Sequence, residues 1–132
     1  MDKRPTRARG GSWWSRRARS FVDAGRGLRW LLTSQPNARI HAVTTVAVVA
    51  LGAWLALAPS EWCAVLLAIG LVWTAEGLNS ALEALADRVA PEEHPLVGRA
   101  KDLAAGAVLA AAIIAALVGL LVFGPKLLAA LA

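Results

Sequence analysis

The stretch LAAGAVLAAAIIAALVGLLVF, residues 103–123, decides the fold because it runs for 21 residues without a charge. A helix of that length spans about 30 Å, which matches the hydrocarbon core of a bilayer. We therefore predict a membrane-spanning helix over residues 101–123. The charged pair Lys101-Asp102 is expected to open this helix, and Gly124-Pro125 to end it.

Two further apolar segments precede this helix, and they predict spans over residues 41–58 and 62–89. We expect a tight turn at residues 59–61 between them and a polar loop with two prolines at residues 90–99. The chain has 132 residues, is 58% hydrophobic and has a mean hydropathy of +0.55, values too apolar for a soluble domain of this size. The fold class is all-α integral membrane, with three spans in one domain over residues 13–132. The single cysteine, Cys63, excludes a disulfide within the chain.

The N-terminal third carries a different pattern. Residues 1–12 are rich in Arg, Gly and Ser without apolar periodicity, which predicts a disordered basic tail. In residues 13–34, apolar residues recur at steps of three and four on one face, and basic residues follow the opposite face. This pattern predicts an amphipathic helix lying on the membrane surface. Its apolar face comprises Trp14, Ala18, Phe21, Gly25, Leu28 and Leu32.

The net charge of +5 is unevenly placed, since ten of the fourteen basic residues lie within residues 1–40. Such a segment suits anionic lipid headgroups or nucleic acid, and the apolar segments that follow favour lipid. We therefore predict no nucleic-acid partner and a cytoplasmic N-terminus. The segment SRRARSF, residues 15–21, resembles a twin-arginine signal. Because about twenty residues with several charges separate it from the first apolar segment, we interpret that segment as a retained span.

An acidic row marks the second span. Glu76, Asn79, Glu83 and Asp87 are spaced three, four and four apart, so they share a sector about 60° wide, with Ser80 beside it. Glu76 would lie about 21 Å from the outer end of the helix, and Glu83 about 10 Å closer to the cytoplasm. A carboxylate at that depth costs a few kcal/mol unless it is paired, hydrated or protonated, and so indicates function. The alternative is a hydrogen-bonded network that joins helices.

Phosphoryl transfer suits this row. Carboxylates bind Mg²⁺, and a partly desolvated glutamate can take a proton from a hydroxyl. Lys101 would add a cation for phosphates and Asp102 a metal or ribose contact, although both also suit an ordinary solvated helix start. No Walker A motif is present, so a soluble kinase fold is not expected.

Three motifs resemble the signature of the prokaryotic diacylglycerol kinase family. The members of this family are small membrane-embedded lipid kinases. The motifs are EGLNSALEALADR at residues 76–88, HPL at 94–96 and AKDLAAGAVL at 100–109. The segment FVDAGRGLRWLLTSQPNARIH, residues 21–41, resembles the family's surface helix. The EW pair at 61–62 and the C-terminal GLLVFGPKLL, residues 119–128, resemble the Gram-positive branch, whose members phosphorylate undecaprenol.

The resemblance implies a homotrimer in the bacterial plasma membrane, with composite active sites at the cytoplasmic interface. MgATP would be the phosphoryl donor and a membrane lipid alcohol the acceptor. Glu76 would be the general base and Glu83 a metal ligand. The remaining implied site residues are Asn79, Asp87, His94, Lys101 and Asp102 for ATP, and Arg26, Arg29 and Ser80 for the lipid.

One position departs from the family pattern. A second metal-binding glutamate often precedes the first span, and here that position is Gln35. Its carbonyl can still coordinate Mg²⁺, but one negative charge is missing.

Undecaprenol is the favoured acceptor and diacylglycerol the second. Two other function classes stay open: a non-catalytic scaffold or transporter subunit that uses the acidic row, and a membrane-tethered nucleic-acid binder that uses residues 1–20.

Overall fold

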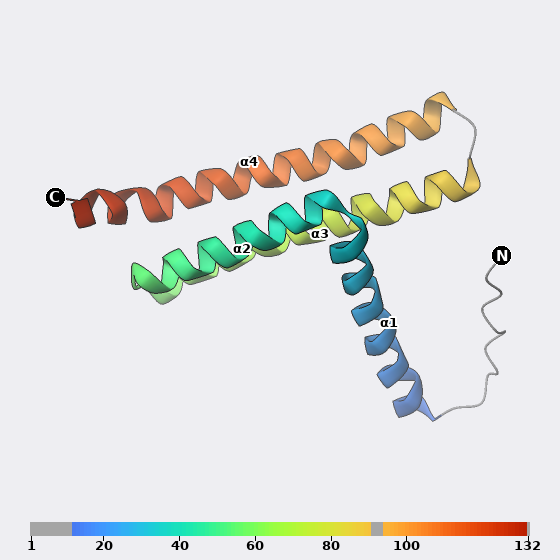
Figure 1. Cartoon of the computed structure of the whole chain (residues 1–132), viewed down its shortest axis with the longest axis horizontal. Coiled ribbons are helices and arrows are strands. Elements are labelled where there is room, and N and C mark those ends of the chain that lie inside the picture. Colours follow the sequence, from blue (N-terminus) through green and yellow to red (C-terminus); the bar gives the residue numbers. More distant parts are fainter. Residues whose placement is uncertain (1–11, 91–93, 132) are drawn as a thin grey trace.

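The computed structural model describes residues 12–90 and 94–131, and these form four α-helices (Figure 1). Their bounds are Trp13–Ser34 for α1, Pro36–Trp54 for α2, Pro59–Val89 for α3 and Pro95–Leu131 for α4. The described part of the chain is therefore all-helical, as the sequence predicts. Most of the predicted basic tail, residues 1–11, lies outside the described residues, as do residues 91–93 of the predicted polar loop.

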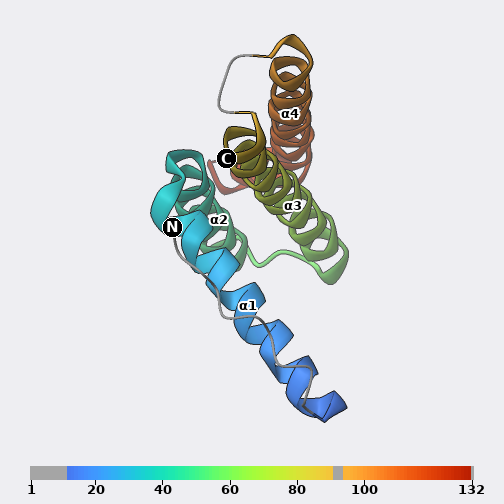
Figure 2. The same ribbon diagram turned by 90° about the vertical axis from the view of Figure 1, so that its right-hand side faces the viewer.

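Helices α2, α3 and α4 run side by side with alternating direction, whereas α1 points away from them at an angle (Figures 1 and 2). The most extensive packing joins α3 to α4, while α1 and α2 contact each other and α3. The short connections enforce this antiparallel order. One end of α1 is therefore attached to the bundle, and the rest projects from it.

Among the described residues, α3 and α4 are long and apolar enough to cross a membrane. Large apolar side chains are exposed along both helices, for example Leu67, Leu78, Leu103 and Leu121. A soluble monomer does not leave such surfaces in water. Lipid or another protein surface is the environment that these helices fit.

The start of α2 at Pro36 lies before the predicted residue 41, and the start of α3 also differs from prediction. The expected turn at residues 59–61 is wrong, because Pro59 begins the helix and the turn falls at residues 55–58. Proline suits the first helical position, where its missing N–H has no helical partner. The side chain of Glu61 reaches back and accepts a hydrogen bond from the N–H of Ala58 at 2.6 Å. Correspondingly, the helix predicted over residues 41–58 ends at Trp54.

Helix α4 is longer than predicted at both ends. It begins at Pro95, so Lys101 and Asp102 do not open the helix but lie in its second turn. His94 caps this start, since its Nδ1 accepts a hydrogen bond from the N–H of Leu96 at 3.2 Å. The predicted end at Gly124-Pro125 is also wrong, because the helix continues through Pro125 to Leu131. Proline is tolerated in membrane helices where neighbouring groups satisfy the freed carbonyl, and Leu and Ala favour helix beyond it.

A small apolar core holds one end of the bundle. Leu57, Val65 and Phe123 are buried together there, one from each of the α2–α3 turn, α3 and α4. Gly52 permits this packing, because a Cβ at that position would lie 2.9 Å from Leu57 Cδ1 and from Trp62 Cη2. The ion pair between Lys126 and Glu61, at 3.1 Å, closes the same end.

The opposite end of α2 forms an elbow with α1. Gln35 is the single residue between the two helices, with φ −104° and ψ 115°, and its N–H donates to the carbonyl of Leu31 at 3.1 Å. The guanidinium of Arg39 donates to the carbonyls of Leu32 and Thr33, which are among the last of α1. Arginine at such a position satisfies free carbonyls and opposes the negative end of the helix dipole. Arg39 therefore fixes the angle between α1 and α2.

Candidate active site

The acidic row predicted in α3 lies on that helix's buried face. Glu76 and Ser80 are each 1% exposed and Asn79 is 6% exposed, in a molecule with few buried residues. These three are the buried polar side chains among the described residues, and Val72 continues the same face by one turn. The sequence prediction that the row faces the protein interior is therefore correct for these positions.

Three oxygens of this cluster have no hydrogen-bond partner: Glu76 Oε2, Asn79 Oδ1 and Ser80 Oγ. A buried polar atom without a partner costs about 1–3 kcal/mol, and more if it is charged. Evolved proteins rarely keep such a group unless something binds it. Two of the three atoms can only accept hydrogen bonds or coordinate a cation, so the cluster fits a hydroxyl or a cation.

The elbow covers this cluster. Trp73 Nε1 donates a hydrogen bond to Thr45 Oγ1 at 3.0 Å, which fixes the register between α3 and α2. Seven residues, or two turns, further along each antiparallel helix lie Ala38 and Ser80, which are 0% and 1% exposed. Both helices of the elbow contact α3, and this register directs the start of α2 toward the polar part of α3.

Asn79 connects the buried part of the row to its outer part. Its Nδ2 donates to Glu83 Oε1 at 3.1 Å, and Glu83 is half-buried. This contact orients the amide and leaves Oδ1 as the free acceptor. Asn79 and Glu83 are thus joined to each other, about one turn and about two turns from Glu76 along α3.

At the end of the row, Asp87 pairs with Lys101 of α4 at 3.0 Å. Their side chains are 70% and 39% exposed, so the pair faces solvent or headgroups rather than the bundle interior. Asp102 is exposed beside them. The structure therefore brings two of the predicted ATP-binding residues together and grades the row from buried Glu76 to exposed Asp87.

Four other predicted residues lie elsewhere. His94 caps α4, which is a structural role, so its contact with ATP stays a prediction. Arg26 pairs with Asp23 at 3.3 Å and is exposed on α1, as is Arg29. Neither arginine is brought to Glu76. Gln35 is half-buried in the elbow between α1 and α2.

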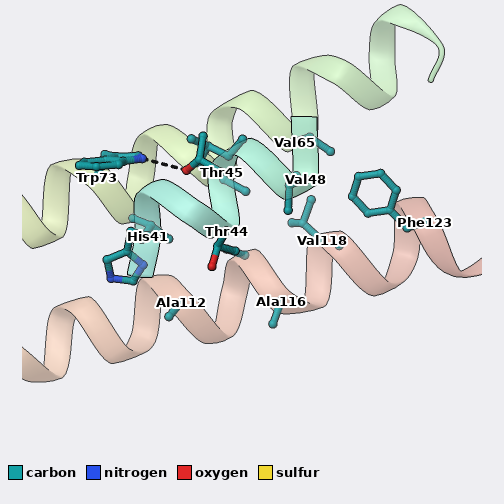
Figure 3. Close-up of a pocket in the computed structure, with 15 residues that line it drawn as sticks. His41, Thr44, Thr45, Val48, Val65, Trp73, Ala112, Ala116, Val118 and Phe123 are labelled. Atoms are coloured by element: carbon teal, nitrogen blue, oxygen red, sulfur yellow. Dashed lines mark hydrogen bonds between the residues drawn. The ribbon is translucent and has the colours of Figure 1, made fainter. Parts of the chain in front are cut away.

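The sequence analysis missed the side chains that α2 contributes. His41 and Thr44 line a cavity between α2, α3 and α4 (Figure 3), and Thr45 holds Trp73. Three polar side chains within the first ten residues of an apolar segment were the available signal. The Thr45–Trp73 contact has no signal in the sequence, since the two residues are 28 positions apart.

The donor set fits a magnesium ion in part. In residues 12–90 and 94–131, no three His, Cys, Asp or Glu side chains converge. However, Mg²⁺ uses few protein ligands and completes its shell with water and substrate phosphates. The free Oδ1 of Asn79 and the carboxylate of Glu83 are oxygen ligands of the required kind. They are the residues that would hold the ion.

The model of the prokaryotic diacylglycerol kinase family matches residues 23–123, which is most of the chain. The chain belongs to this family. It is 41% identical over 109 residues to undecaprenol kinase of Bacillus subtilis, an alignment that covers 83% of this chain and 89% of that one. It is 42% identical over 110 residues to a diacylglycerol kinase of Synechocystis, covering 83% of this chain and 63% of that one.

A third relative is the diacylglycerol kinase of Escherichia coli, which is 37% identical over 90 residues, 68% of this chain and 74% of that one. All three relatives are named as kinases of lipid alcohols. The prediction of a membrane lipid kinase of this family is confirmed. The matched region, residues 23–123, includes every predicted site residue.

Proposed function

We propose that this chain transfers the γ-phosphoryl group of ATP to undecaprenol, with diacylglycerol as the second candidate acceptor. The observation that carries the proposal is the carboxylate of Glu76. It is 1% exposed in an apolar helix of a lipid-kinase family member, and its Oε2 has no partner. Such an atom is suited to receive the proton of a substrate hydroxyl.

Glu76 acts as the general base in this mechanism. The lipid hydroxyl donates a hydrogen bond to Glu76 Oε2, and the proton passes to the carboxylate as the lipid oxygen bonds to the γ-phosphorus. The bond from that phosphorus to the bridging oxygen breaks, and ADP leaves with the electron pair. Release of that proton to water restores the base.

The outer part of the row positions the donor. Asn79 and Glu83, which are hydrogen-bonded to each other, would face the phosphates, and Lys101, paired with Asp87, would supply a cation at the solvent-facing end. Mg²⁺, when bound by Glu83 and Asn79, would neutralise charge on the β- and γ-phosphates. Asp87, His94 and Asp102 are proposed to contact the remainder of the nucleotide. Gln35 would add a neutral carbonyl ligand.

The lipid reaches Glu76 from the bilayer. Ser80, 1% exposed and without a partner for Oγ, is proposed to hydrogen-bond the lipid hydroxyl beside Glu76. Arg26 and Arg29 lie exposed on α1, where they would bind headgroups near the entry.

The assembly we propose is a homotrimer in the bacterial plasma membrane, with α2, α3 and α4 as spans and the N-terminus in the cytoplasm. Basic residues near α1 and at the α3–α4 connection support that orientation. The extensive exposed apolar surface of α3 and α4 supports an oligomer.

The acceptor is inferred from the relatives. Undecaprenol is supported by the Bacillus subtilis kinase, whose alignment covers most of both chains. Diacylglycerol is supported by the cyanobacterial and Escherichia coli kinases, whose alignments cover smaller shares of those proteins. Purified protein in detergent with MgATP, offered both lipids at equal mole fraction, decides between them. We expect a higher kcat/KM for undecaprenol, and turnover of neither lipid by intact protein would refute the kinase proposal.

Glu76→Gln tests the base directly. Because general base catalysis contributes about 10²–10⁴-fold, we expect kcat to fall by that factor with little change in KM for ATP. Glu61→Gln is the matched control, since it makes the same change on the same helix at the opposite end of the bundle, and we expect nearly normal kcat. Full activity of Glu76→Gln would assign the base elsewhere. Altered assembly with no ATP-dependent activity in any variant would favour a scaffold.

A further inference from the structure

A cavity of about 250 Å³ lies between α2, α3 and α4, outside the row that the proposed mechanism uses. One end is lined by polar side chains, His41 and Thr44, and the other is apolar and bounded by Val65 and Phe123 (Figure 3). The wall formed by α4 consists largely of small residues, which leave the space open. They include Ala112, Ala116 and Gly119.

Glu76 lies one helical turn beyond the polar end of this cavity, on the buried face of α3. Val65, Ala68 and Val72 line the cavity and are spaced three and four apart on the buried face of α3, and Glu76 is the next buried position on that face. On α2, His41 lies four residues before Thr45, which contacts Trp73, and Glu76 lies three residues after Trp73. Figure 3 shows His41 and Trp73 at the same end of the cavity, so this end is the one nearer to Glu76.

The geometry points to this cavity as the site for the hydrocarbon segment next to the acceptor's hydroxyl, an inference that rests on the proposed function. An alcohol with its oxygen at Glu76 directs its first carbons along the α3 face toward Phe123. The polar and apolar ends of the cavity match the two parts of such a molecule. His41 lies where the hydroxyl, and then the new phosphate monoester, is placed.

The volume of this cavity limits how much of a lipid can enter it. Pockets for whole small ligands measure about 300–1,000 Å³, so this cavity takes one short segment of chain, and the remainder runs into the bilayer. An alcohol with one chain attached to the carbon that bears the hydroxyl presents a single segment to the cavity. Diacylglycerol presents a branched glycerol with two acyl chains, only one of which fits. The cavity therefore favours a single-chain polyprenol over a two-chain lipid.

The variants Ala112→Leu and Ala116→Leu test whether the cavity binds this hydrocarbon segment, because the larger side chains would fill the cavity. Because a few methylene groups in an apolar pocket change kcat/KM by about tenfold or more, we expect that loss for undecaprenol, mainly through KM. KM for ATP should not change. Ala110→Leu is the matched control, since Ala110 lies on the same helix, is exposed and does not line the cavity. An unchanged KM for undecaprenol in both filled variants, with wild-type turnover intact, would overturn this inference and leave the proposed function standing.

A binding measurement without ATP separates the two proposals further. In a Cys63→Ser background, Val48→Cys places a thiol in the cavity wall, and Val43→Cys places one on the exposed side of α2. We expect undecaprenol to slow N-ethylmaleimide alkylation at position 48 several-fold and not at position 43. Equal effects at both positions, or none, would contradict occupancy of the cavity. Protection at position 48 in a protein that phosphorylates neither lipid would support the cavity and refute the kinase proposal.

Discussion

We expect Gln35 to stand where the family often has a second metal-binding glutamate. It lies half-buried in the elbow between α1 and α2, which both contact α3, and we propose that a carboxylate there would be a further ligand for the magnesium ion. We predict that Gln35→Glu lowers the Mg²⁺ concentration for half-maximal turnover several-fold, because added negative charge strengthens cation binding. A titration of initial rate against Mg²⁺ at saturating ATP measures this.

The matched control for Gln35→Glu is Asn37→Asp, which adds the same charge two residues away on an exposed position. It should leave the Mg²⁺ requirement close to that of the parent chain. If both variants lower the requirement equally, the effect is general electrostatics at the elbow and Gln35 is not a ligand position.

Gly52 is a residue whose importance comes from packing. A methyl group there would lie 2.9 Å from side-chain atoms of Leu57 and Trp62, which are held by the small core. We predict that Gly52→Ala lowers the free energy of unfolding by about 1–3 kcal/mol, the usual effect of overpacking. Thermal unfolding in detergent, followed by circular dichroism, should show a lower Tm.

Gly70→Ala serves as the comparison for Gly52→Ala. No atom lies within 4 Å of a Cβ at Gly70, so the better helix propensity of alanine should raise stability by up to about 1 kcal/mol. Equal Tm values for the two variants would show that the core relaxes around the added methyl group.

At the scale of elements, two ion pairs join α3 to α4 at opposite ends. Lys101 pairs with Asp87 near the candidate site, and Lys126 pairs with Glu61 at the other end. Exposed or partly exposed pairs contribute about 0–1 kcal/mol to stability, so neither substitution should unfold the protein. We predict that Lys101→Met raises KM for ATP by about tenfold or more, the loss expected for a hydrogen bond to a charged phosphate.

Lys126→Met controls for the loss of an α3–α4 ion pair as such. It should change the Tm as little as Lys101→Met does and should leave KM for ATP unaltered. If both variants raise KM alike, then the rigidity of the hairpin, and not a phosphate contact, explains the effect.

The presence of the helices could be predicted from the sequence, but several of their ends could not. Long uncharged segments have few structures available in lipid, so the apolar helices were predictable from composition alone. Pro59, Pro95 and Pro125 were interpreted as breaks, yet the first two begin helices and the third lies inside one. Proline removes the hydrogen bond that its own nitrogen would donate and crowds the carbonyl four residues earlier, neither of which matters in the first turn; inside a helix, tertiary context decides whether the helix ends.

The candidate site was likewise predictable from the sequence only in part. The periodicity of α3 predicted that Glu76, Asn79 and Glu83 share a face, and the structure buries the first two on it. It could not predict how α2 packs against this face, because the register between α2 and α3 is set by the contact of Thr45 with Trp73. Contacts between residues far apart in sequence depend on side-chain fit, and periodicity carries no information about that fit.

At the scale of the whole molecule, the chain buries little of its own apolar surface. Its core is confined to one end and to a few residues, while large side chains such as Ile113, Leu117 and Leu120 remain exposed along α4. Lipid can cover such a surface, but lipid does not supply the fixed geometry that phosphoryl transfer requires. A second protein surface against α3 and α4 would supply it.

We therefore predict that the protein in mild detergent has three times the 13.8 kDa mass of one chain, as measured by light scattering or native mass spectrometry. Because association then contributes to folding, the Tm should fall on dilution at constant detergent-to-protein ratio. Loss of turnover should follow the loss of the trimer along the same dilution series. A monomer that phosphorylates lipid at the full rate would show that α3 and α4 of one chain position both substrates unaided, and the composite site would be wrong.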